Sequence, residues 1–290
     1  MCGIDAVMGR NAIIKALLIT LGQLERGTKG TGVAYISNNK IKIVKEPIHP
    51  LTFFTKYFDV LNNQSDVAIA HNRAPSQGIV SYENTHPFLA CDKSFALIHN
   101  GTSWNNDERQ YLTKLGHKFQ GQTDSEVLMH ILEEYYLATN DYVEALQKLV
   151  NYNLSGAIII LTKEGEIYAT KRGYEPLNYV KVNGEVYLAS IPQAIANIIK
   201  DTKDYEIARV KSKQIVRVRP NRKVEIIGEG EEDYTAYGLG KLFDNCEYSY
   251  NNKNKKEEEE KDDFVEQLRR KRRETIYYFD PATNEWYEYP

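Results

Sequence analysis

The order in which strand-like and helix-like segments follow one another most constrains the fold of this 290-residue chain. Apolar segments with strand character come early, helical patterns follow, and strands then resume. The predicted strands lie at 32–37, 40–45, 66–72 and 94–100, and later at 156–162, 166–171, 185–190, 213–219 and 223–228. The predicted helices lie at 11–24, 105–115, 124–138, 141–150 and 192–200. This order favours an α+β fold over regularly alternating strand–helix units.

Short turn signals separate several of the predicted strands. Asn38-Asn39 stands between two of them, and Asn183-Gly184 precedes another. Asn and Gly accept the backbone conformations of tight hairpins. We therefore expect antiparallel sheets covered by helices and not a doubly wound parallel sheet. The first helix has Asn11 as its expected N-cap, and Gly27 follows soon after its end.

Composition and charge exclude several classes of protein. A net charge of −3 gives no overall attraction to nucleic acid, and no apolar run approaches the roughly 18 residues of a membrane span. The start of the chain lacks the regions of a secretory signal. Cys2, Cys91 and Cys246 are few and far apart, which indicates a cytoplasmic protein without disulfides. Because CxxC and HxxxH spacings and a Gly-rich phosphate loop are absent from the sequence, we expect neither a metal site nor a cofactor.

The character of the sequence changes near residue 230. We expect one domain over 1–230, a charged linker or exposed helix over 231–274, and an aromatic hairpin or docking tail over 275–290. The middle segment is acidic first and basic afterwards. Its RRKRR stretch is next to an acidic block, which argues against a nucleic-acid site. The sequence contains no internal repeat that would suggest a solenoid.

Cys2 is the first candidate for chemistry. A Met followed by a small residue is commonly removed, which would free the α-amine of Cys2. A free α-amine has a pKa of about 7.7–8.0 and can act as a general base near neutral pH. The thiol and the base would then belong to one residue, as in N-terminal-nucleophile enzymes. Alone, a Met-Cys-Gly start leaves open that Cys2 has no catalytic role.

Four further clusters occur in a fixed order along the chain. They are LERGTKGTGVA at 24–34, HNRAPSQG at 71–78 with ENTHPF at 83–88, IHNGTSWN at 98–105, and GQTDSEV at 121–127. With the N-terminal cysteine, this series resembles the class II glutamine amidotransferases over roughly residues 2–228. Related domains form the ammonia-producing halves of glucosamine-6-phosphate synthase, amidophosphoribosyltransferase and asparagine synthetase. The resemblance implies the Ntn-hydrolase fold, a four-layer αββα sandwich of two antiparallel sheets.

The resemblance also implies roles for individual residues. Cys2 is the expected nucleophile, and Asn100 with Gly101 is the expected oxyanion hole. The expected substrate-binding residues are Arg73, Ser76, Gln77, His86 and Asp124. Arg26 and Gly27 are expected to pack beside the nucleophile. His86 is expected to be mainly structural, since a catalytic imidazole is unnecessary when an amine is the base. His71 and His99 are expected to be satisfied buried polar groups.

Arg73 and Asp124 can also be interpreted physically. A guanidinium suits bidentate capture of an α-carboxylate, and a carboxylate suits an α-ammonium, so the pair would recognise a free amino acid at both ends. The alternatives are a surface ion-pair Arg and an ordinary helix-capping Asp. Asn100-Gly101 has the alternative of a simple turn. Ala74 stands where synthase members of the family often have Trp, which puts tight coupling to a synthase in doubt.

The leading hypothesis is hydrolysis of L-glutamine to glutamate and ammonia through a Cys2 thioester. A second hypothesis is an N-terminal-nucleophile amidase acting on another amide. A third is a catalytically silent module with this fold, used for regulation or interaction. The sequence does not identify an ammonia acceptor, and no recognisable synthase domain follows residue 228. The sequence also does not reveal the oligomeric state or whether Met1 is removed.

We hypothesise that the C-terminal segment recruits a separate ammonia-accepting enzyme, because free ammonia would otherwise diffuse away. A tagged full-length chain should co-purify with that enzyme, whereas a chain ending at residue 232 should recover much less of it. Quantitative mass spectrometry of the two pull-downs measures the difference. Equal recovery with both chains would show that the segment has no recruiting role.

Overall fold

The computed structural model describes residues 1–62, 65–103, 106–199, 202, 205–231, 277–280 and 285–288. The chain divides into two compact units, Met1–Thr235 and Ala236–Pro290. In the second unit, strands β14 (Tyr277–Asp280) and β15 (Glu285–Glu288) pair antiparallel. The proposed linker over 231–274 lies outside the described residues except for Glu231, so the predicted domain boundaries stay predictions.

The first unit contains two antiparallel sheets. In spatial order the seven described strands of one sheet are β11 (Glu206–Arg209), β9 (Asn178–Val182), β10 (Glu185–Ala189), β1 (Gly3–Met8), β4 (Val67–Asn72), β2 (Thr31–Ser37) and β3 (Lys40–Glu46). The six described strands of the other are β13 (Val224–Ile227), β12 (Ile215–Val218), β8 (Ile167–Arg172), β7 (Gly156–Thr162), β6 (Phe95–Asn100) and β5 (Phe88–Leu89). Every pairing within these sheets is antiparallel.

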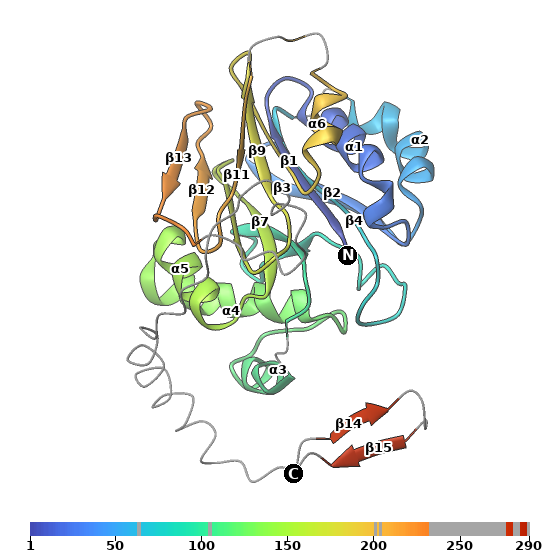
Figure 1. Ribbon diagram of the computed structural model, residues 1–290, viewed down its shortest axis with the longest axis vertical. Helices are drawn as coiled ribbons and strands as arrows, with labels where there is room; N and C mark the ends of the chain where they lie inside the picture. Colours follow the sequence, from blue (N-terminus) through green and yellow to red (C-terminus); the bar gives the residue numbers. More distant parts are fainter. Residues whose placement is uncertain are drawn as a thin grey trace, which may run out of the picture. The chain divides into compact units, whose positions relative to one another are not determined.

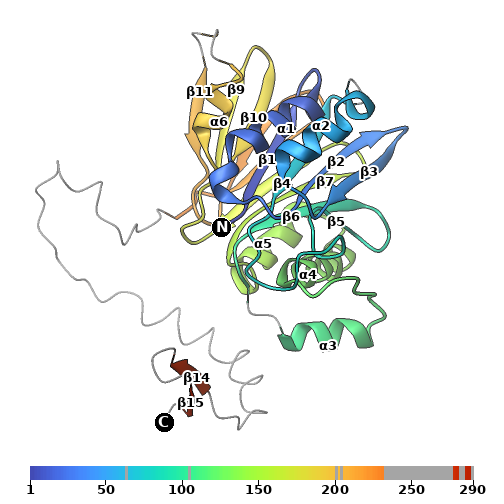
Figure 2. The same ribbon diagram turned by 90° about the vertical axis from the view of Figure 1, so that its right-hand side faces the viewer.

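Helices cover the outer faces of both sheets (Figures 1 and 2). Helices α1 (Ala12–Gly22), α2 (Pro50–Leu61) and α6 (Pro192–Ala196) share a buried apolar cluster with the first sheet. Helices α4 (Asp124–Thr139) and α5 (Tyr142–Tyr152) share another with the second sheet. The layers are therefore helix, sheet, sheet and helix, which confirms the predicted αββα sandwich. The short η1 (Leu24–Arg26) follows α1, and α3 (Asn106–Lys114) precedes α4.

A third apolar cluster lies between the two sheets. Ile4, Ala6 and Met8 of β1 contribute to it from one side, and Ile98 of β6 and Ile159 of β7 from the other. These alternate residues of β1 share one face because side chains of a strand point to opposite sides in turn. The other face of β1 bears Asp5, whose carboxylate accepts hydrogen bonds from Thr20 of α1 and from Gln23 just after that helix. β1 is thus buried on both faces, and this fixes the position of Cys2 at its N-terminal end.

Most predicted elements are present within a few residues of their expected bounds. The hairpin between β2 and β3 turns through Asn38 and Asn39, with φ angles of 50° and 55°. Asn183 and Gly184 turn between β9 and β10, also with positive φ angles. Asn11 occupies the N-cap position of α1, as expected, but its side chain does not cap the helix. Asn11 has a left-handed backbone conformation, and its side chain makes no capping hydrogen bond.

Among the described residues, no helix is both long and apolar enough to cross a lipid bilayer.

Candidate active site

Residues from distant parts of the chain line one small pocket. Cys2 lies at the start of β1, Arg73 directly after β4, Gly101 directly after β6, and Asp124 at the first position of α4. The pocket is also lined by Ala74, Ser76, Gln77, His86, His99, Thr123 and Ser125. The structure therefore brings together seven of the ten residues singled out in the sequence. Of the others, Asn100 and Arg26 bond to Cys2, and Gly27 packs behind Arg73.

The backbone nitrogen of Cys2 donates a hydrogen bond to Asn100 Oδ1, with a distance of 2.9 Å between them. Asn100 Nδ2 in turn donates to Glu175 Oε2 at 2.7 Å. An amide NH2 group carries two protons. The bond to Glu175 uses one and leaves the second available to another acceptor. Asn100 is thus held at both ends and still has one donor to offer.

Glu175 is a residue that the sequence analysis did not identify. Its Oε2 atom also accepts from Arg26 Nη2 at 3.1 Å. Arg26 Nε donates to the backbone carbonyl of Cys2 at 2.8 Å. Arg26 and Glu175 therefore connect the carbonyl of Cys2 to the side chain of Asn100. Glu175 follows β8 in a loop, and no motif distinguishes it from other surface acids in the sequence.

The thiol of Cys2 lies against the backbone of Ala74. The Sγ atom is 3.5 Å from the Ala74 carbonyl oxygen and 3.4 Å from the Ala74 nitrogen. Burial raises the pKa of the Cys2 thiol, whereas the Ala74 hydrogen bond and the positive charges of the chain terminus, Arg73 and Arg26 lower it by smaller amounts. The thiol is therefore neutral at pH 7 and needs a base when it attacks a substrate.

Arg73 is buried, with 2% of its surface exposed. Its Nη1 donates to the carbonyl of Ile79 at 2.8 Å, and its Nη2 donates to the carbonyls of Gln77 at 2.7 Å and Gly78 at 3.3 Å. The guanidinium thus organises the loop that follows it. These bonds use three of the five N–H groups of the guanidinium.

Asp124 begins α4, but Thr123 is the N-cap, and its side chain accepts from the Glu126 nitrogen. One carboxylate oxygen of Asp124 accepts from the Ser103 nitrogen at 2.6 Å. The capping alternative for Asp124 therefore does not apply, because a neighbouring residue fills that role.

Ser76 and Gln77 lie on the loop after Arg73. Ser76 is exposed, and its hydroxyl accepts from the hydroxyl of Thr102 at 3.4 Å. Gln77 is partly buried, and its carbonyl is one of those that bind Arg73. Both residues line the pocket next to Cys2 from its more exposed side.

Two buried histidines, His86 in the pocket and His71 beside it, are neutral. Burial lowers the pKa of His71 to about 3 and that of His86 well below its ordinary value. His86 Nδ1 is 3.3 Å from His71 Nδ1, and neither Nε2 has a hydrogen-bond partner among the described residues. His99 is satisfied as expected, with Ser125 Oγ and the Ser155 carbonyl each 2.9 Å from one ring nitrogen. His71 is satisfied only in part.

Two glycines permit close backbone approach at the site. A Cβ atom at Gly27 would lie 2.4 Å from the carbonyl carbon of Arg73, and one at Gly101 would lie 2.3 Å from the Ser155 carbonyl oxygen. Real Cβ atoms do not come this close to backbone atoms. Any larger residue would displace the ends of β4 or β6, and with them Arg73 or Asn100.

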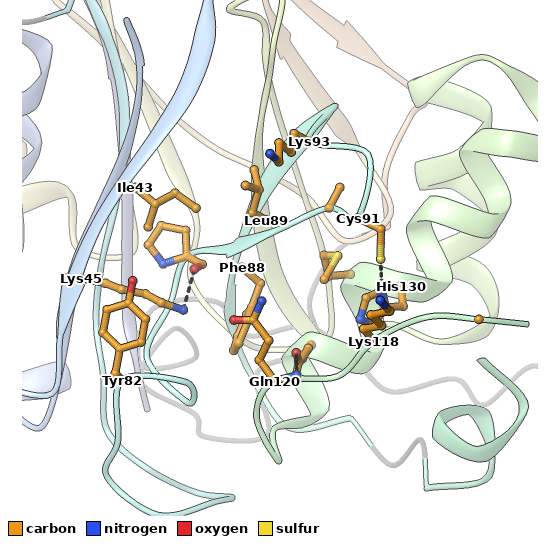
Figure 3. A pocket seen from close by; sticks show the side chains of 15 residues that line it. Ile43, Lys45, Tyr82, Phe88, Leu89, Cys91, Lys93, Lys118, Gln120 and His130 are labelled. Carbon is orange, nitrogen blue, oxygen red and sulfur yellow. Dashed lines mark hydrogen bonds between the residues drawn. The ribbon is translucent and has the colours of Figure 1, made fainter. Parts of the chain in front are cut away.

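The pocket at Cys2 has a volume of only about 20 Å³, room for about one water molecule. A larger cavity of about 540 Å³ lies elsewhere in the first unit (Figure 3). Its lining includes Lys45, Tyr82, Phe88 and Cys91, and none of the predicted catalytic residues.

The chain matches the family model described as glutamine amidotransferase domain over residues 58–226. The matched stretch contains Arg73, Asn100, Gly101 and Asp124 and begins after Cys2. A glutamine–fructose-6-phosphate aminotransferase (isomerizing) of Caldanaerobacter subterraneus subsp. tengcongensis is 31% identical over 222 residues, which are 74% of this chain and 36% of the relative. The chain spans about a third of the length of the curated relatives it matches.

Solved structures share the fold. Glutamine phosphoribosylpyrophosphate amidotransferase from B. subtilis, complexed with ADP and GMP, superposes with a TM-score of 0.66 at 21% identity. The match covers 77% of this chain and 49% of that one. A glutamine aminotransferase class-II domain protein from Silicibacter pomeroyi superposes with a TM-score of 0.54 at 15% identity, over 79% of this chain and all of that one.

The raised pKa of the Cys2 thiol predicts its reactivity. Alkylation by iodoacetamide should be slow near neutral pH and should accelerate by about tenfold per pH unit up to about pH 9, because the thiolate is the reactive form. Peptide mass spectrometry of the Cys2 adduct at a series of pH values measures the rate. A rate that levels off below about pH 7 would contradict this prediction, since it would require a lowered pKa.

Proposed function

The chain belongs to the glutamine amidotransferase domain family, and from that membership we propose that it hydrolyses L-glutamine through a thioester on Cys2. The observation that carries the proposal is the shared pocket. Cys2, Arg73, Gly101 and Asp124 come from four segments separated by 23 to 71 positions and line the same small space. A nucleophile, a cation and an anion at one pocket suit an amino-acid substrate with an amide side chain.

The α-amine of Cys2 is the proposed base. Met1 precedes Cys2 in the chain, so this role requires removal of Met1. The neutral histidines of the pocket support the assignment, because the Sγ of Cys2 bonds only to the Ala74 backbone in the described part of the chain. A free α-amine with a pKa of about 7.7–8.0 is partly unprotonated near neutral pH and can take the thiol proton.

The reaction then proceeds in two steps. The Cys2 sulfur attacks the side-chain amide carbon of glutamine while its proton passes to the α-amine. The resulting oxyanion is stabilised by the second proton of Asn100 Nδ2 and the backbone N–H of Gly101. The C–N bond breaks, the amine returns its proton, and ammonia leaves. Water attacks the thioester, releases glutamate and restores the thiol.

Recognition of the two ends of glutamine is assigned to Arg73 and Asp124. The α-carboxylate would bind the Arg73 N–H groups that the carbonyls of Gln77, Gly78 and Ile79 do not use. The α-ammonium would bind the Asp124 oxygen that Ser103 does not use. Ser76 and Gln77 would close the exposed side of the bound amino acid, and His86 would pack beneath it.

We also propose that the released ammonia passes to an acceptor enzyme. The relative described above is named as an aminotransferase that acts on glutamine and fructose 6-phosphate. This chain spans about a third of the length of such relatives. An acceptor enzyme or domain would use the ammonia that this domain releases. The pull-down with the chain ending at residue 232 tests one route of recruitment.

Glutamine hydrolysis is expected to depend entirely on Cys2. The purified wild-type chain should lack Met1 by intact-mass measurement and should release glutamate and ammonia from glutamine. Cys2→Ala should lower the rate by a factor of about 10³ or more, because the covalent step is lost. Retained activity in Cys2→Ala would overturn the proposed function, and active protein that retains Met1 would overturn the amine as the base.

Asp124→Asn should raise the KM for glutamine by about tenfold or more, since the ammonium would lose its counter-charge in a site with little water. Steady-state glutaminase kinetics measure the effect. The matched control is Asp141→Asn, because Asp141 begins the next helix and caps it by accepting from Val143 and Glu144. Equal KM values for wild type and Asp124→Asn would remove Asp124 from substrate recognition.

A further inference from the structure

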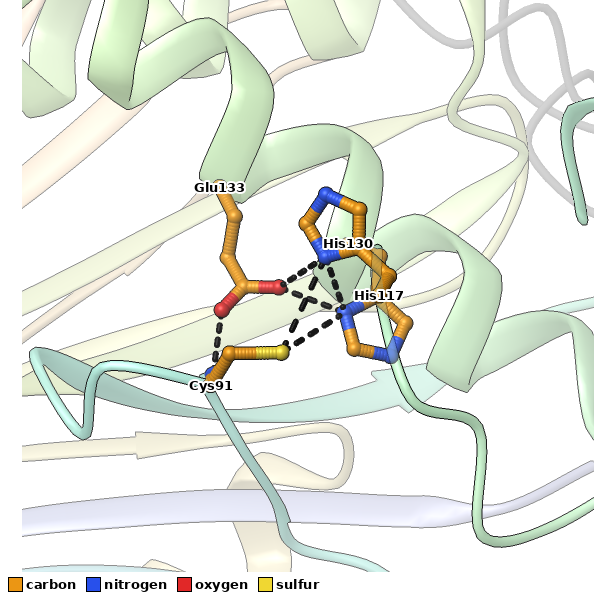
Figure 4. Close-up of side chains that lie close together, drawn as sticks. All are labelled: Cys91, His117, His130 and Glu133. Carbon is orange, nitrogen blue, oxygen red and sulfur yellow. Dashed lines mark hydrogen bonds and ion pairs between the residues drawn. The ribbon is translucent and has the colours of Figure 1, made fainter. Parts of the chain in front are cut away.

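Four side chains with nitrogen, oxygen and sulfur donors converge outside the Cys2 pocket (Figure 4). Cys91 lies in the turn between β5 and β6, and His117 lies between α3 and α4. His130 and Glu133 are one turn apart on α4. One donor atom from each residue lies within 4.8 Å of the others. We call these four residues the Cys91 cluster.

The spacing of the donor atoms is close to that of a tetrahedral metal site. His117 Nδ1 is 3.0 Å from His130 Nδ1 and 3.2 Å from Glu133 Oε2. Cys91 Sγ is 3.7 Å from each of the two Nδ1 atoms. Tetrahedral ligands at Zn²⁺ bond lengths of about 2.0–2.3 Å lie about 3.3–3.7 Å apart. The 2.5 Å contact between His130 Nδ1 and Glu133 Oε2 would open slightly around an ion.

Hydrogen bonds alone do not pair all the donor and acceptor atoms of the Cys91 cluster. His117 Nε2 is 2.9 Å from Glu134 Oε1, and a neutral ring that donates there presents a lone pair at Nδ1. That lone pair faces the Glu133 carboxylate and the His130 ring. A cation at the centre would be attracted by all of these donors at once.

The surroundings also match those of metal sites. Histidines that bind metals commonly donate their second ring N–H to a carboxylate, which fixes the ring. Glu134 is placed to accept from His117 in this way. The second oxygen of Glu133 accepts from the backbone nitrogen of Cys91, which orients that carboxylate toward the centre. His130 Nε2 has no such partner among the described residues and lies beside the ring of Phe119.

We propose that the Cys91 cluster binds one Zn²⁺ ion as a structural site. Thiolate and imidazole donors favour Zn²⁺ over Mg²⁺ or Ca²⁺, which prefer oxygen ligands. Four protein donors complete a tetrahedral shell and leave no position for a reacting water molecule. His130 is 1% exposed and Glu133 is 5% exposed, so the ion would be shielded on the α4 side.

The 540 Å³ cavity gives the ion a path to the site. Cys91 and His130 line that cavity, and Figure 3 shows both side chains at one end of it. Once bound, the ion would join the turn after β5 and the segment before α4 to the middle of α4. The Cys91 cluster shares no residue with the Cys2 pocket, so the zinc proposal and the proposed glutaminase activity fail or succeed separately.

Metal analysis of untagged full-length protein tests the proposal. We expect about one Zn²⁺ per chain by inductively coupled plasma mass spectrometry. After removal of zinc by a chelator, added Co²⁺ should produce a thiolate-to-cobalt charge-transfer band and tetrahedral visible absorption. Cys91→Ser should abolish the charge-transfer band, whereas Cys246→Ser and Cys2→Ser should retain it. Circular dichroism checks that each variant is folded.

A second variant tests whether the cluster binds a metal or only stabilises the fold through hydrogen bonds. Glu134→Gln should weaken Zn²⁺ binding by about 10- to 100-fold, measured by competition with a chromophoric chelator. Glu144→Gln, on the exposed face of α5, should leave it unchanged. Absence of zinc and of any cobalt band in folded wild-type protein would overturn the proposal. The cluster would then be a set of hydrogen bonds and close polar contacts among the four side chains and Glu134.

Discussion

The hydrogen bond from the Cys2 nitrogen to Asn100 Oδ1 is the contact on which the rest of the site depends. It joins the start of β1 in one sheet to the end of β6 in the other. The two strands carry opposite sides of the apolar layer between the sheets, so their packing sets the distance that this bond spans. Glu175 holds the other end of the Asn100 amide, and Arg26 holds both Glu175 and the Cys2 carbonyl. Cys2, the proposed nucleophile, is therefore positioned by the packing of the two sheets.

Burial determines which groups at the site can exchange protons. It raises the pKa of the Cys2 thiol and lowers the pKa values of His71 and His86, so all three are neutral near pH 7. Burial also lowers the pKa of the Arg73 guanidinium, but its ordinary pKa lies so far above 7 that the group stays charged. Such a site suits the proposed reaction, in which a proton moves from the thiol of Cys2 to the α-amine of the same residue.

The sequence predicted the elements that carry local signals. Asn38-Asn39 marks a hairpin because both residues accept positive φ, and the long α4 has an apolar face with Thr123 as its cap. The central strand β1 was not predicted, since six buried residues next to the chain start show no alternation. Helix α2 and strands β5, β9 and β11 were also not predicted. Strands β9 and β11 pair with each other at separations of 25 to 31 positions, which no local pattern reveals.

Local motifs also determine which residues of the site could be predicted from the sequence. Arg73, Asn100 and Asp124 follow recognisable motifs at the ends of strands or the start of a helix. Glu175 has no motif, and its role depends on two partners that are 75 and 149 positions away. We expected no metal site from the sequence, because CxxC and HxxxH spacings are absent. The Cys91 cluster escapes that criterion, since Cys91 is 42 positions from Glu133.

Helix α4 links the two sites described in this protein. Asp124 is its first residue, and His130 and Glu133 lie six and nine positions later, about 9 and 14 Å along the axis. An ion at the Cys91 cluster would fix the middle of α4 to the turn after β5. Because β5 pairs with β6, the same turn is connected to the strand that ends at Asn100. The metal would then act on catalysis only through the stability of this framework, because no ligand reaches the Cys2 pocket.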